Sequence, residues 1–147
     1  MNSSTTQTLR RSISALGLIA IAIIHILDLP SKWSEVRYLG VGYVGVIVVS
    51  LVLAERIVMK KSNRDYLLAA ALSASVLTGF IITRTVGMPG AMDDIGNWLE
   101  PVGLVSIVVE ALVVWNSLRA IKESTNERSI QHRLTKNDLR ELTNSNS

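Results

Sequence analysis

The chain has 147 residues, of which 48% are hydrophobic and 18% charged, and the charged residues gather in short segments between long apolar runs. This distribution excludes a soluble domain, because so short a chain has no core that could hide those runs. The formal net charge of +3 does not indicate a nucleic-acid partner, since most basic residues flank apolar runs without a basic stripe or an aromatic stacking motif. Cysteine is absent, which excludes disulfides, thiolate metal sites and covalently attached haem.

Four apolar runs predict four membrane-spanning helices. They cover residues 12–29, 38–57, 66–83 and 101–118. Each has the length of about 20 residues that a helix needs to cross the hydrocarbon layer. The connections are short, so consecutive helices should be antiparallel neighbours. We therefore predict an all-α membrane protein that folds as an antiparallel four-transmembrane-helix up-down bundle in a lipid bilayer.

The distribution of Lys and Arg predicts the orientation and the division of the chain. The sparser side of the bundle has Lys32, Arg37 and Arg84, and the richer side has Arg10, Arg11, Arg56, Lys60, Lys61, Arg64, Arg119 and Lys122. Because the richer side is normally cytoplasmic, both termini are expected on the cytoplasmic side of the cell membrane. Residues 1–11 then form a cytoplasmic N-terminal segment, residues 12–118 the transmembrane domain and residues 119–147 a polar cytoplasmic tail.

The N-terminal run and the tail each leave an alternative. No small-residue cleavage pattern follows the first run, so we expect a retained helix rather than a signal peptide. Within the tail, Ile130, Leu134 and Leu142 fit a short amphipathic helix capped by Thr135 and Asp138. The Ser- and Asn-rich end fits a disordered tail equally well.

His25 and Asp28 lie on one face near the end of the first predicted helix, because three positions separate them. They fit a structural pair between helix ends, or a site for proton exchange or metal binding. A metal would need further ligands, for which Met88, Met92, Asp93 and Glu100 are weak candidates that suit copper better than zinc. A single imidazole without a thiolate argues against that site, and no cofactor is identified.

Arg84 and Glu100 bracket a Gly- and Pro-rich hairpin between the third and fourth helices. A charge at the mouth of a membrane bundle costs free energy unless it is paired or used, and Asp93, Asp94 and Glu100 are the available partners for Arg84. The cluster predicts either a clamp that closes the hairpin or an anion site at the N-terminus of the fourth helix. Glu100 already places a carboxylate at that N-terminus, which favours the clamp.

Glu110 is the one acid expected deep in the hydrocarbon region. An isolated carboxylate there is expensive, so it should be protonated, or paired with Arg56 or with the hydroxyls of Ser73 and Ser106.

Small residues predict where helices approach closely. Ala71, Ser75, Gly79 and Thr83 recur at every fourth position of the third helix and form a smooth face for another helix or another subunit. A comparable stripe on the first helix includes Gly17, and it is expected to turn inward together with His25.

Several short motifs together resemble a known group. They are a first-helix His, Pro30-x-x-Trp33-x-Glu35-x-x-Tyr38-x-Gly40, Thr83-Arg84-Thr85-x-Gly87-x-Pro89, and Glu100-Pro101-x-Gly103 with Glu110. This combination resembles small, uncharacterised four-helix integral membrane proteins of prokaryotes. The resemblance implies no substrate, and it implies that one set of residues acts together: His25, Glu35, Arg84, Gly87, Pro89, Glu100 and Glu110.

The sequence contains no Ser/His/Asp grouping, Gly-rich phosphate loop or HExxH motif. We therefore predict a non-enzymatic accessory or self-associating component of a membrane assembly. The alternative is a binding or transport protein with a small-ligand or metal site at the outer mouth, formed by His25, Asp28, Arg84 and Glu100. A membrane oxidoreductase that reduces a lipid quinone is the third interpretation, and it lacks a second intramembrane His for haem.

Overall fold

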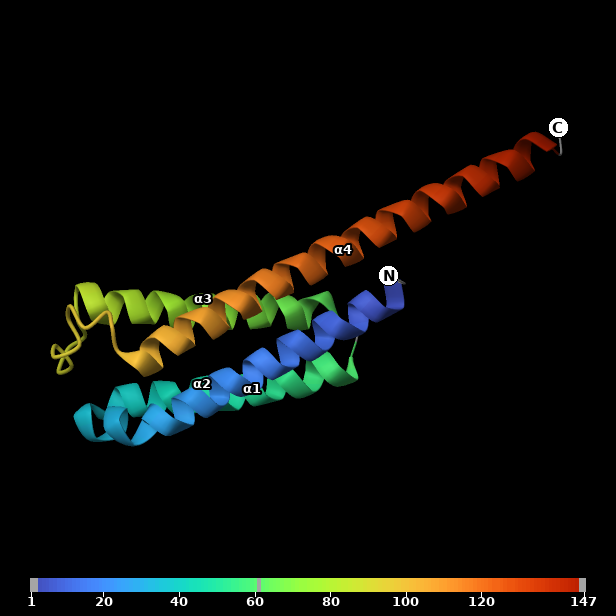
Figure 1. The fold of residues 1–147 in the computed structure, drawn as a ribbon. Coiled ribbons are helices and arrows are strands. Elements are labelled where there is room, and N and C mark those ends of the chain that lie inside the picture. The colour runs from blue at the N-terminus through green and yellow to red at the C-terminus, as the bar shows by residue number, and fades with distance from the viewer. Residues whose placement is uncertain (1–2, 61, 146–147) are drawn as a thin grey trace.

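The computed structural model describes residues 3–60 and 62–145, which form four helices. These are α1 (Ser3–Glu35), α2 (Arg37–Met59), α3 (Asn63–Thr85) and α4 (Pro101–Ser145), and consecutive helices run antiparallel (Figure 1). All four are long and apolar enough to cross a membrane. The predicted all-α four-helix bundle is confirmed, and the chain is a multi-pass membrane protein.

Helix α1 is longer than the apolar run that predicts it. It continues through Pro30 to Glu35, because the proline removes a backbone hydrogen bond without ending the helix. His25, Asp28, Lys32 and Glu35 therefore share one helix at spacings of three, four and three, which places them on one face. This stripe ends at the same end of the bundle as residues 86–100, which we call the hairpin end.

Helix α4 extends far past the other helices at the opposite, terminal end of the bundle (Figure 1). The predicted tail is therefore helical through Ser145, as a continuation of the fourth helix rather than a separate element. Thr135 does not act as a cap, since its hydroxyl donates to the carbonyl oxygen of Gln131 within the helix at 3.0 Å. The predicted roles of Asp138 and Leu142 fall on side chains outside the described part of the chain.

The helices pack as two antiparallel pairs, α1 with α2 and α3 with α4, and α1 joins the pairs by packing on α4. The core lies where α1 packs on both α2 and α4 and includes Leu18, Ile21, Leu53, Ile57 and Val113. At Gly17 the two helices approach so closely that an added Cβ would overlap the Val113 side chain. Helices α2 and α3, in contrast, touch only sparsely, so this side of the bundle is open.

The hairpin between α3 and α4 is shaped by its glycines. Val86 and Gly87 both donate their N–H to the carbonyl oxygen of Ile82, and Gly87 takes a φ of 78°, a left-handed conformation that commonly ends a helix. The N–H of Gly96 returns to the carbonyl oxygen of Arg84 at 3.0 Å. Pro101 then begins α4, a position that needs no N–H donor. This folding brings the charges of residues 94 and 100 back to Arg84.

Candidate functional site

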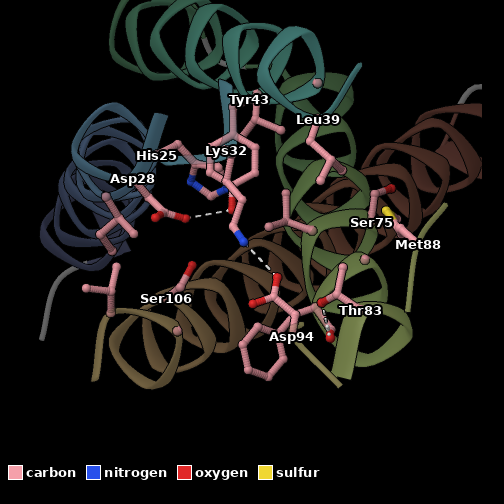
Figure 2. A pocket seen from close by; sticks show the side chains of 18 of the residues that line it. His25, Asp28, Lys32, Leu39, Tyr43, Ser75, Thr83, Met88, Asp94 and Ser106 are labelled. Carbon is pink, nitrogen blue, oxygen red and sulfur yellow. Dashed lines mark hydrogen bonds and ion pairs between the residues drawn. The ribbon is translucent and has the colours of Figure 1, made fainter. Parts of the chain in front are cut away.

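A cavity of about 400 Å³ lies at the hairpin end and is lined by residues of all four helices and the hairpin. Figure 2 shows His25, Asp28 and Lys32 pointing into this space beside Tyr43 of α2 and Asp94 of the hairpin. The opposite wall is mainly apolar. Its residues come from α2, α3 and α4 and include Leu39, Val46, Leu72, Val76, Phe80 and Val102. A polar end and an apolar wall thus meet in one space.

Two buried cations organise the polar end. The guanidinium of Arg84, which is 4% exposed, forms ion pairs with Asp94 at 2.5 Å and with Glu100. The Lys32 ammonium bonds to the other carboxylate oxygen of Asp94 and to Glu35, each at 2.7 Å. Asp94 therefore bridges the two cations and links α1 to the hairpin. Glu100 completes the connection to α4.

This network assigns partners among the predicted acids. Arg84 uses Asp94 and Glu100, while Asp93 is exposed on the hairpin. The guanidinium also lies 4.9 Å from the centre of the Phe80 ring, which stabilises its charge by a cation–π contact. The geometry is that of the predicted clamp. An anion facing Arg84 would have to displace one of these carboxylates.

His25 and Asp28 both line the cavity but do not bond to each other. Nδ1 of His25 lies 2.9 Å from the carbonyl oxygen of Ile21, and one carboxylate oxygen of Asp28 accepts the Tyr43 hydroxyl at 2.9 Å. The rings of His25 and Tyr43 lie 4.8 Å apart. The predicted direct pair is thus replaced by two separate hydrogen bonds, one within α1 and one between α1 and α2.

Glu110 is 1% exposed and lies just beyond the cavity, one helical turn from Ser106, which lines it. The Ser106 hydroxyl donates to one oxygen of Glu110 at 2.7 Å, while the other oxygen is buried without a partner among the described residues. Arg56 does not reach Glu110, because it pairs at 2.7 Å with Asp65 at the terminal end. The buried Ser73 hydroxyl likewise has no hydrogen-bond partner among the residues that the structure describes.

The predicted small-residue face of α3 looks onto the cavity rather than onto a closely packed helix. Ser75, Gly79 and Thr83 line the cavity, and Ala71 is exposed beside it. A Cβ added at Gly79 would meet nothing within 4 Å. The close approach predicted from these residues does not occur within the chain, because α2 diverges from α3 here.

The metal alternative gains no support from this geometry. Among the residues that the structure describes, no group of three His, Cys, Asp or Glu side chains is placed to hold a metal ion. Asp28 and Glu100 are engaged by Tyr43 and Arg84. Met88 lines the cavity, but Met92 is largely exposed.

A second cavity of about 470 Å³ lies at the terminal end, between α1, α3 and α4. Most of its charged residues bond to the chain itself: Arg10 pairs with Glu123 at 2.5 Å, and Arg11 donates to two carbonyl oxygens in the last turn of α2. These contacts connect the ends of α1, α2 and α4, so a structural role accounts for the charged residues of this cavity. The hairpin-end cavity is the better candidate site, because it combines a buried polar cluster with an apolar wall.

Lys32 and Tyr43 are the site residues that sequence reasoning missed. Lys32 follows Pro30, beyond the end of the apolar run, so it was used only to predict the orientation of the bundle. Had the helix been extended through the proline, the spacing of four from Asp28 and of three from Glu35 would have indicated the place of Lys32 in the stripe. No comparable sequence signal marked Tyr43, whose contact depends on how α2 packs on α1.

Acid is expected to destabilise the hairpin end through Asp94. Burial opposes ionisation of this carboxyl, but its hydrogen bonds and charge interactions with Lys32 and Arg84 outweigh burial and hold its pKa below its usual range. Such a carboxyl stabilises the fold above its ordinary pKa of about 4, and this contribution disappears as the pH falls through the lower, folded-state pKa. The melting temperature in detergent should therefore fall below about pH 4, and Asp94→Asn should flatten that part of the profile. Asp93→Asn is the control, and an Asp94→Asn profile as steep as that of the unmodified protein would contradict the assignment.

Comparison with protein-family models, with curated proteins and with solved structures found no match for this chain. The assignment of function therefore depends on the chemistry of the cavity itself.

Proposed function

We propose that this chain is a non-enzymatic membrane protein that binds a small amphiphilic molecule in the hairpin-end cavity. The observation that supports this most directly is a cavity of about 400 Å³ with a mainly apolar wall facing a buried polar cluster. Small-molecule sites in proteins commonly measure about 300 to 1,000 Å³ and combine apolar walls with a few polar groups. The apolar body of a ligand would lie along α2 and α3, with its polar group toward α1.

The open side of the bundle provides a route for such a ligand. Gly42 and Ser75 line the cavity and are also exposed at the surface, on either side of the gap between α2 and α3. In a bilayer this surface faces lipid, so a molecule dissolved in the membrane reaches the cavity without crossing the charged hairpin. We infer lateral entry from the membrane.

Substitutions that fill the cavity test the proposal. Gly79→Leu and Gly42→Leu place a side chain into open space along the cavity, so they should abolish binding while leaving the fold intact. Gly45→Leu is the matched control, because Gly45 is also in open space but does not line the cavity. The probes are phenylbutylamine, phenylbutanol and phenylbutyrate, which share one apolar body. Binding is measured by equilibrium dialysis against the protein in nanodiscs.

At least one probe should bind the unmodified protein and Gly45→Leu but not Gly79→Leu. If no probe binds in a manner that Gly79→Leu abolishes, the cavity is not a binding site for molecules of this class and the proposal fails.

We also propose that the protein resides in the cell membrane with both termini in the cytoplasm, which places the cavity near the outer surface. The excess of Lys and Arg at the terminal end supports this orientation. Reporter fusions after Ser62 and Ser124 should then report a cytoplasmic location, and a fusion within residues 90–94 an external one. An external signal from the Ser124 fusion would contradict the topology.

An accessory role in a larger membrane assembly is the second candidate. The extension of α4 beyond the bundle favours it, because this polar, exposed helix presents a surface that the rest of the chain does not cover (Figure 1). Self-association across Ala71, Ser75, Gly79 and Thr83 would instead cover the opening of the cavity. The native mass of the full chain in mild detergent, with and without other membrane proteins of its host, distinguishes a partner from a second copy.

A further inference from the structure

The hydrogen-bond donors at the polar end of the cavity are largely used within the chain. Lys32 bonds to Glu35 and Asp94, Arg84 to Asp94 and Glu100, and the Tyr43 hydroxyl to Asp28. The Nε atom of Arg84 is buried without a partner among the described residues. Lys32 keeps one N–H beyond its two bonds, so the polar end offers few free donors to a ligand that brings only acceptors.

Two of the acceptors that remain open lie close together on α1. The first is His25, a side chain only 5% exposed that lines the cavity. Its Nδ1 faces the carbonyl oxygen of Ile21, which can only accept, so Nδ1 carries the proton and the neutral ring leaves Nε2 as an acceptor. No described residue donates to Nε2. An imidazole nitrogen that faces the cavity without a partner among the described residues can accept a hydrogen bond from a donor that a ligand supplies.

The second open acceptor is the carboxylate of Asp28. One of its oxygens accepts the Tyr43 hydroxyl, and no described residue bonds to the other. Asp28 and His25 are separated by three positions of α1, and Figure 2 shows both facing the same space. A group between them could donate to both acceptors at once. The aromatic ring of Tyr43 lies beside this position, since it contacts both residues.

The charge balance selects among donors. The ionisable residues that line the cavity, apart from His25 and the tyrosines, are the cations Lys32 and Arg84 and the carboxylates of Asp28, Asp94 and Glu100. Two positive and three negative groups leave a formal excess of one negative charge. The two cations are matched by Asp94 and Glu100, so the excess resides on Asp28. In a site of low dielectric constant this excess favours a positively charged ligand.

We propose that the cavity binds an organic cation, namely a protonated amine attached to an apolar body. This inference rests on the proposed function of the cavity. The ammonium group donates to Asp28 and to Nε2 of His25 and lies against the face of Tyr43, a surface that attracts cations. The apolar body occupies the wall formed by α2 and α3. An anionic amphiphile is rejected because its charge would face Asp28 and add to the negative excess of the lining, and because most donors are engaged.

The three probes named above test the charge of the ligand, since they differ only in the polar group. Phenylbutylamine is a cation at neutral pH, phenylbutanol is a neutral donor and phenylbutyrate is an anion. The unmodified protein should bind the amine at least tenfold more tightly than the alcohol and should not bind the acid measurably. Asp28→Asn should lower the affinity for the amine roughly tenfold and change that for the alcohol little.

Two variants separate this effect from a general change in charge or folding. Asp93→Asn removes the same charge from an exposed position of the hairpin and should leave the affinity for the amine unchanged. Asp28→Glu keeps the charge and should retain the preference for the amine. The comparison of probes on the unmodified protein does not depend on any variant folding.

Equal or tighter binding of the alcohol or the acid by the unmodified protein would overturn the cation assignment while leaving the cavity as a binding site. An unchanged preference for the amine in Asp28→Asn would also overturn it. If no probe binds the unmodified protein in a manner that Gly79→Leu abolishes, the proposed function itself is rejected.

Discussion

Replacing Arg84 with alanine is expected to lower the free energy of unfolding by about 3–5 kcal/mol, the usual cost of removing one partner from a buried ion pair. Arg84 is 4% exposed and is the ion-pair partner of Glu100, and it shares Asp94 with Lys32. Without the guanidinium, Glu100 loses its cation and Asp94 of the hairpin loses its ion pair with α3. Thermal melting and denaturant titration in detergent measure the change.

A double-mutant cycle with Glu100→Gln isolates the pair. Because the neutral amide no longer requires a cation, Arg84→Ala should cost less in the Glu100→Gln background than in the unmodified protein. Arg37→Ala is a suitable control, since Arg37 is exposed at the same end of the bundle. A coupling free energy near zero would show that Arg84 and Glu100 do not act as a pair.

Replacing Gly17 with leucine is expected to destabilise the bundle by about 1–3 kcal/mol or more, the cost of overfilling a packed interface. A Cβ at this position already overlaps the Val113 side chain, and the backbones of α1 and α4 cannot separate without disturbing the core around Leu18 and Ile21. Val113→Ala should restore part of the loss. Melting temperatures of the single and double variants measure both effects.

The control for this prediction is Gly45→Leu, which adds the same side chain where an added Cβ has no neighbour within 4 Å. Its melting temperature should stay close to that of the unmodified protein. If Gly17→Leu melted like Gly45→Leu, the tight seam would not lie between α1 and α4.

The number and type of the helices were accessible from sequence because they depend on local properties. An apolar run of sufficient length must satisfy its backbone hydrogen bonds as a helix in lipid, whatever its neighbours are. The importance of Arg84 and Glu100 followed in the same way, since charges at the end of such a run need partners. The link from Ser106 to Glu110 was also expected, because four positions along a helix bring two side chains together.

The arrangement of the helices was decided only by the tertiary structure. Small residues permit a close approach but do not specify where it occurs: Gly17 lies in a tight seam, whereas Gly79 lines an open cavity. Three contacts of the site join residues that are distant in the chain or lie in a loop. They are the ion pair of Arg84 with Asp94 rather than Asp93, the ion pair of Lys32 with Asp94, and the hydrogen bond from Tyr43 to Asp28. Such contacts depend on the path of the hairpin and the packing of α2 on α1, which no periodicity encodes. The cavity exists because α2 and α3 diverge, and that divergence is a property of the packed bundle rather than of any one helix.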